Sequence, residues 1–109
     1  MADTLKVLGQ SNPSATTLTT LYTVPGATTA VCSSIVVCNQ AASAGTFRIA
    51  VRVAGAAIAA KQYLYYDVSI AANDTFTATL GLSLATTDVV SVYASSATMS
   101  FNLFGVERA

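Results

Sequence analysis

The stretch TFRIAVRV, residues 46–53, shows the clearest alternation of apolar and polar side chains in the chain. Phe47, Ile49, Val51 and Val53 fall on one side of an extended backbone, and the residues between them fall on the other. A period of two residues is typical of a half-buried strand, whereas a helix repeats every 3.6 residues. We therefore predict a strand here, with Phe47 and its three companions facing a core.

Strand character recurs on both sides of this stretch. Thr, Val and aromatic residues are enriched in these segments, and such residues suit a pleated sheet. The further predicted strands are residues 5–9, 17–24, 29–39, 58–67, 75–80, 89–94 and 98–106. Within them, Phe76 and Ala78 are expected to face inward, as are Met99, Phe101 and Leu103. About eight short strands separated by turns predict an all-β fold, a single antiparallel β-sandwich with jelly-roll or Greek-key connections. A small closed barrel is the alternative.

Two connecting segments allow more specific predictions. Pro25-Gly26 suits the second and third positions of a type II turn, in which Gly takes a positive φ. Residues 54–62 contain Gly55 among helix-forming Ala, Lys and Gln, and we favour strand or loop over a helical turn there.

The length of 109 residues corresponds to one domain. Residues 1–14, interrupted by Pro13, are expected to form an N-terminal strand or arm, and residues 15–109 the β-sandwich domain. The opening residues 1–6 lack the basic and apolar regions of a secretory signal, and no apolar stretch reaches the roughly 20 residues of a membrane helix. We therefore expect synthesis in the cytoplasm.

The chain is poor in charge. It has 5 basic and 5 acidic residues, 9% charged residues and 53% hydrophobic residues, whereas ordinary soluble domains have about 25% charged residues. Zero net charge gives no attraction to nucleic acid or to an anionic membrane, so neither is an expected partner. Because interface cores are depleted of charge, the composition favours a subunit that contacts other protein molecules, including its own copies.

The residues that usually carry catalysis are scarce. The chain has no His, the commonest acid–base group at neutral pH, and no Ser in a G-x-S-x-G elbow. We expect no enzymatic activity and no cofactor.

The cysteines and aspartates offer weak metal-binding signals. In a regular strand, Cys32 and Cys38 share a face about 20 Å apart, too far for a disulfide. Two cysteines without His are too few for zinc, so we expect two buried small side chains. Asp67, Asp74 and Asp88 lie near strand ends, where they could converge on calcium. Without a calcium-loop motif, we expect them to stabilise turns.

The tyrosines near residue 65 indicate a contact surface. Alternation places Tyr63 and Tyr65 on one face and Leu64 and Tyr66 on the other, so that one pair is core and the other is surface or interface. We favour a protein contact over a sugar contact, because the chain has no Trp.

Several stretches resemble a known group of proteins. Residues 8–10 read LGQ, residues 19–25 TTLYTVP, residues 33–39 SSIVVCN, residues 71–75 AANDT and residues 101–107 FNLFGVE. Together they resemble small virion proteins of tailed bacteriophages, mostly uncharacterised, found among cyanophages and other aquatic phages. The resemblance covers residues 8–107, contains no catalytic motif and implies a structural subunit located in the virion.

The sequence thus suggests a capsid decoration (cement) protein that stabilises the shell by contacts with the major capsid protein or other virion proteins, as a homo-oligomer with a trimer favoured. The alternatives are a tail, neck, baseplate or fibre-associated β-domain, and a carbohydrate-binding host-recognition module with a Tyr63/Tyr65 or Tyr66/Tyr93 platform. Arg48 and Arg52 could pair with acidic residues of a neighbour. The expected interface residues are Leu5, Val7, Pro13, Arg48, Arg52, Tyr65, Tyr66, Phe104, Glu107 and Arg108.

Overall fold

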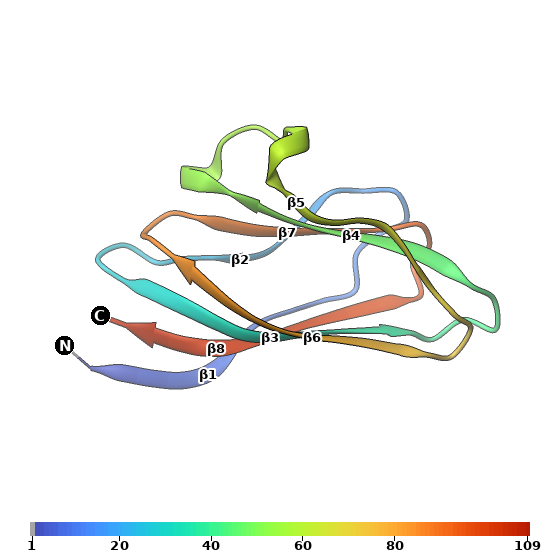
Figure 1. Cartoon of the computed structure of the whole chain (residues 1–109), viewed down its shortest axis with the longest axis horizontal. Helices are drawn as coiled ribbons and strands as arrows, with labels where there is room; N and C mark the ends of the chain where they lie inside the picture. The colour runs from blue at the N-terminus through green and yellow to red at the C-terminus, as the bar shows by residue number, and fades with distance from the viewer. Residues whose placement is uncertain (1) are drawn as a thin grey trace.

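A computed structural model describes residues 2–109. Eight strands form two four-stranded sheets that pack face to face (Figure 1). The strands are β1 (Asp3–Ser11), β2 (Thr19–Thr23), β3 (Thr29–Asn39), β4 (Gly45–Arg52), β5 (Tyr63–Ile70), β6 (Thr75–Leu84), β7 (Val89–Ala94) and β8 (Met99–Arg108). The predicted all-β sandwich is confirmed. No helix among the described residues is long and apolar enough to cross a membrane.

The strand order identifies the connections. The first sheet has the order β1-β8-β3-β6, the second sheet has the order β2-β7-β4-β5, and every neighbouring pair is antiparallel. The chain changes sheet at every connection except the one between β4 and β5. This is the arrangement of a jelly roll. Of residues 1–14, expected to form a strand or an arm, residues 3–11 form edge strand β1, while Met1 lies outside the described residues.

The core lies between the two sheets, where the alternation places it. Phe47 and Ile49 of β4 are fully buried, and Phe47 contacts Phe101 of β8 with ring centroids 6.3 Å apart. Val53 does not continue this pattern. It is exposed in a single 3-10 turn, Val53–Gly55, because Ala54 takes a positive φ of 53° and ends the strand.

The predicted shared face of Cys32 and Cys38 is wrong. Cys32 pairs with Gly105 and Ser34 pairs with Phe104, so Ser33 is an extra residue in β3. Such a bulge reverses the alternation beyond it. Cys32 is therefore buried in the core, whereas Cys38 is partly exposed on the opposite face.

Two predictions about connections are also wrong. The positive φ after β2 belongs to Ala27, at 55°, and not to Gly26, so Pro25-Gly26 is not the centre of a type II turn. Residues 54–62 contain helical turns at their ends, one at Val53–Gly55 and one at Ala60–Gln62. The second turn is held by Gln62, whose Oε1 accepts a 2.7 Å hydrogen bond from the Ala59 N–H.

Candidate functional site

Apolar side chains gather on the outer face of the first sheet. In antiparallel strands, directly opposed residues point to the same side. Leu5 opposes Val106, which also opposes Val31, and Val7 opposes Phe104. Leu5 is 83% exposed, Val31 48% and Val7 46%. We call these residues, Leu5, Val7, Val31, Phe104 and Val106, the apolar patch.

The patch brings three of the expected interface residues together. Leu5, Val7 and Phe104 were chosen from the ends of the chain, and pairing of β1 with β8 places them side by side. Val31 and Val106 are additional members that sequence reasoning missed. Only the register of β3 against β8 brings Val31 to this face, and that register is set by residues far apart in the chain.

Pairs of polar side chains lie at the two ends of the patch along the strand direction. At one end, the Arg108 guanidinium binds the Asp3 carboxylate, with Nε 2.7 Å from Oδ1 and Nη2 3.0 Å from Oδ2. The hydrogen bond from Arg108 lowers the pKa of Asp3 below its ordinary value. At the other end, the Gln10 amide donates to Asn102 Oδ1 at 2.7 Å. Arg108, an expected interface residue, therefore lies at the rim of the patch, paired within the chain.

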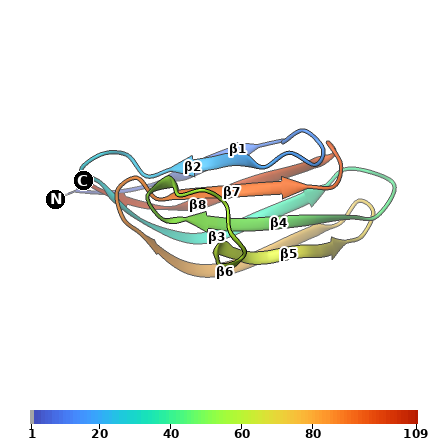
Figure 2. The same cartoon turned by 90° about the horizontal axis from the view of Figure 1, so that it is seen from above.

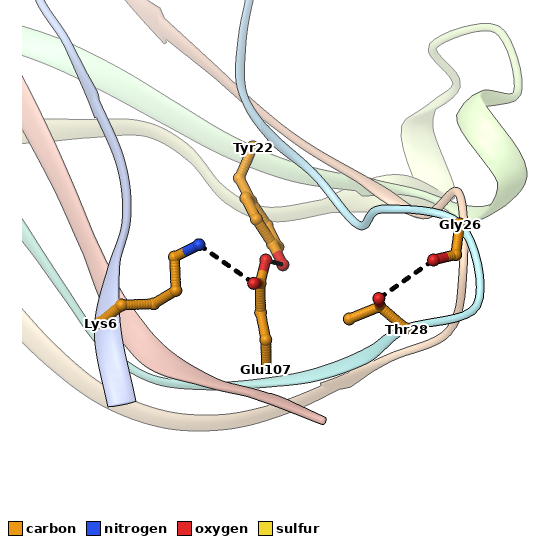
Figure 3. A network of polar contacts seen from close by, with 5 residues as sticks. All are labelled: Lys6, Tyr22, Gly26, Thr28 and Glu107. Carbon is orange, nitrogen blue, oxygen red and sulfur yellow. Dashed lines mark hydrogen bonds and ion pairs between the residues drawn. The ribbon is translucent and has the colours of Figure 1, made fainter. Parts of the chain in front are cut away.

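Glu107, another expected interface residue, joins the two sheets. Figure 3 shows its carboxylate between Lys6 of β1 and Tyr22 of β2. The Lys6 ammonium lies 3.0 Å from Oε1, and the Tyr22 hydroxyl donates to Oε2 at 2.5 Å. These two contacts, Tyr22 first, lower the pKa of Glu107. Only 14% of the Glu107 side chain is exposed, so its partners are in its own chain.

A second cluster lies on the second sheet around Arg48 of β4. Phe47 opposes Val68 and Ile49 opposes Tyr65, so the single residue Arg48 faces a bulge of two residues in β5. The bulge contains Asp67, whose φ is 50°. Arg48 Nε lies 2.6 Å from Asp67 Oδ1, and this hydrogen bond raises the pKa of Arg48.

Tyrosine rings complete this cluster. The Arg48 Cζ lies 4.1 Å from the ring centroid of Tyr66 and 4.2 Å from that of Tyr93, distances typical of cation–π contacts. Tyr66 also meets Tyr63 edge to face, with centroids 4.9 Å apart. An open hollow of about 540 Å³ lies beside these rings, lined by Ile58, Ala59, Ala60, Tyr63 and Tyr66.

The predicted grouping of the tyrosines is wrong. Tyr65 packs on the core, with its ring centroid 5.3 Å from that of Phe76. Tyr63, expected on the same face, opposes Ala50 and contacts Tyr66 instead. An extra residue at position 64 in β5 separates the two, so a Tyr63/Tyr65 platform does not form.

The remaining expected interface residues stabilise the chain locally. Arg52 donates from Nε to the Ala56 carbonyl at 2.8 Å and from Nη2 to the Gly55 carbonyl at 2.9 Å. It thus closes the loop after β4, and both arginines expected to reach a neighbour have partners within the chain. Pro13 is buried in the connection between β1 and β2.

The aspartates do not converge. Among residues 2–109 there is no group of three or more His, Cys, Asp or Glu side chains that could hold a metal ion. Asp88 accepts hydrogen bonds from the Ala54 and Ala85 N–H groups at 2.9 Å each, and Asp74 accepts one from the Thr75 N–H at 2.8 Å. These contacts are those of turn-stabilising residues. Burial raises the pKa of the Cys32 thiol to about 11, which keeps it protonated at neutral pH.

Asn39, at the end of β3, is a structural residue that sequence reasoning missed. It is buried, and its amide donates to the carbonyls of Ser43 at 2.9 Å and Ala71 at 3.2 Å. Its Oδ1 accepts from the Ala41 N–H at 3.1 Å. Asn39 therefore holds the β3–β4 and β5–β6 connections together.

No family model, curated protein or solved structure matches this chain. A jelly roll occurs with many functions, so the fold alone does not specify one. The surface features that bear on function are the apolar patch on the first sheet and the Arg48 cluster on the second.

Proposed function

We propose that this chain is a non-enzymatic structural protein of a bacteriophage particle, a decoration protein that docks on the capsid shell through the apolar patch. The patch is the observation that carries the proposal, because large apolar side chains exposed together mark a protein contact. Leu5, the most exposed of the large apolar side chains among residues 2–109, lies at its edge.

The charge arrangement supports docking on protein. Six of the ten charged side chains form three ion pairs among the described residues, Lys6–Glu107, Arg48–Asp67 and Arg108–Asp3. Paired charges leave little long-range field to attract a nucleic acid or an anionic surface. Burial of the patch against an apolar surface of the shell supplies the attraction instead.

Shell stabilisation follows from repetition of this contact. A subunit that binds only the assembled shell shifts the equilibrium toward assembly by mass action. A contact too weak to hold one subunit becomes effective when a docked chain spans two neighbouring shell subunits. A small domain of 11.1 kDa is suited to this role.

Quantitative mass spectrometry of purified particles from the phage that carries the gene tests the proposal. We expect hundreds of copies per particle, in proportion to the major capsid protein. About a dozen copies or fewer would instead indicate a tail or vertex component. Absence from the particle would refute the proposal.

A variant tests the docking face. Val31→Lys places a charge on the β3 side of the patch, and we expect at least about a tenfold loss of binding to particles that lack the protein, since burying an unpaired charge is costly. Ser69→Lys, also at an exposed strand position but on the second sheet, is the matched control and should bind like the wild type. Equal binding of both variants would refute docking through the patch.

A further inference from the structure

The edges of the two sheets differ in how far they are protected against pairing with another strand. The edge strands are β1 and β6 in the first sheet and β2 and β5 in the second. An edge strand presents unpaired N–H and C=O groups, and proteins block it with charges, bulges or short length. Figure 2 shows β1 and β2 along one long side of the sandwich and β5 and β6 along the other.

Three of the four edges are blocked. β1 directs Lys6 inward toward Glu107 and has a bulge between Val7 and Gly9. β2 has five residues and an irregularity between Thr20 and Tyr22. β5 contains two irregularities in its pairing with β4 and carries Asp67.

β6 has an unprotected stretch. Its ten residues, TFTATLGLSL, include no charge and no proline. Its pairing with β3 is regular from Thr75 to Thr79, and the extra residue in β6 comes only between Thr79 and Leu82. Thr75, Thr77 and Thr79 are exposed, and Thr is a residue type that pairs well across strands.

The core is also incompletely covered on this side. Phe76, Ala78 and Leu80 of β6 pack against the core but stay partly exposed, as do Tyr65 and Val68 of β5. On the opposite side, the Lys6–Glu107–Tyr22 contacts close the gap between β1 and β2 (Figure 3). An added strand beside β6 would shield the partly exposed apolar side chains from water.

We infer that β6 of a second copy of this chain pairs antiparallel with β6, centred on Thr77. In this register Thr77 opposes its own copy, Thr75 opposes Thr79, and Phe76 opposes Ala78. The three threonines then form a cross-strand ladder on the outer face, and each large Phe76 meets a small Ala78 on the inner face. This self-complementarity favours a second copy over an unrelated strand, because a two-fold contact must match itself.

The contact joins two first sheets into one sheet of eight strands. A two-fold contact of this kind closes as a dimer, so it replaces the expected trimer as the solution state. The apolar patch spans β1, β8 and β3, and it stays free in the dimer because the contact uses only the β6 edge. The inference goes beyond the proposed function and does not need it.

Cross-linking tests the register. In a Cys38→Ser background, we expect Thr77→Cys to give a covalent dimer with a short bis-maleimide, because residue 77 lies opposite its own copy. Thr20→Cys on edge strand β2 is the matched control and should stay monomeric. Equal cross-linking of the two variants, or none with Thr77→Cys, would overturn the register.

Sedimentation of the full chain tests the contact itself. We expect the wild type at twice the chain mass of 11.1 kDa, Thr77→Lys at the mass of a single chain, and Thr20→Lys at the wild-type mass. A wild-type chain that is monomeric at all concentrations, or a Thr77→Lys variant that keeps the wild-type mass, would refute the contact. A monomer found in particles would leave the proposed function standing.

Discussion

Removing the Tyr22 hydroxyl is expected to weaken the link between the two sheets. The hydroxyl donates to Glu107 at 2.5 Å, and a hydrogen bond to a charged group contributes about 1.5–3 kcal/mol. In Tyr22→Phe, Glu107 keeps its Lys6 partner and its side chain is 14% exposed, so the lower end of this energy range applies. We expect a loss of about 1.5 kcal/mol at pH 7, which lowers Tm by about 6–7 °C in a domain of this size.

The pH dependence of this loss identifies its cause. The pKa of Glu107 is lowered below 4.5, by Tyr22 first and Lys6 second. The ionised carboxylate therefore stabilises the fold fully above the pKa that Glu107 has in the unfolded chain. This stabilisation is lost as the pH falls through the lower pKa of Glu107 in the folded chain. With Glu107 protonated, the hydroxyl makes only a neutral hydrogen bond of about 0.5–1 kcal/mol. We therefore expect the difference between wild type and Tyr22→Phe to shrink in acid.

Urea unfolding at pH 7 and at the lowest pH where the chain stays folded measures both effects. Tyr66→Phe, the same change on an exposed ring, is the control and should alter the free energy of unfolding by less than about 0.5 kcal/mol. Stability of Tyr22→Phe within about 0.3 kcal/mol of the wild type at pH 7, or a deficit independent of pH, would refute the reasoning.

Three further predictions concern stability and can be measured by the same unfolding experiment. Burial first, and Glu107 second, raise the pKa of Tyr22 above 10.0, so the stability of the wild type should fall as the pH rises past 10. The stability of Tyr22→Phe should depend less on pH in this range, and parallel dependence of the two proteins would contradict this. Asn39→Ala removes the buried amide that hydrogen-bonds backbone groups of Ser43, Ala71 and Ala41 and should cost about 2–3 kcal/mol, and a loss below about 0.5 kcal/mol would count against that network. A Cβ added at Gly105 would press on the backbone of Val31 and Cys32, so Gly105→Ala should cost about 1–3 kcal/mol. Gly26→Ala, which meets open space, is its control, and equal stability of the two variants would contradict the packing described at Gly105.

Alternation along the sequence predicted the core wherever a strand is regular. Phe47 and Ile49 of β4, and Met99, Phe101 and Leu103 of β8, are all buried as expected. Each lies in a stretch that pairs in unbroken register with one neighbouring strand, β4 with β7 and this part of β8 with β3. There, the two-residue period of the backbone alone decides which side chains turn inward.

The same rule failed at β-bulges. Bulges at Ser33 and at position 64 reverse the alternation, so Cys38 faces away from Cys32 and Tyr63 faces away from Tyr65. A bulge is defined by two strands together, and neither strand shows it alone. Contacts such as Tyr22–Glu107, between residues 85 positions apart, likewise depend on the folded topology.

In the candidate site too, some residues could be chosen from the sequence and others are brought in only by the folded pairing. Leu5, Val7 and Phe104 could be selected from the sequence as interface residues near the chain ends, and β1–β8 pairing brings them together. Val31 joins them only through the register of β3. Arg48, chosen for its charge, binds Asp67 because a bulge in β5 turns that carboxylate toward it.

A reconstruction of the purified particle tests the proposed docking most directly. We predict density for the jelly roll on the capsid shell, with the outer face of β1, β8 and β3 seated on a shell protein and Leu5, Val31 and Phe104 buried at the contact. A particle in which this face is open to solvent, or in which the jelly roll has no density, would contradict it.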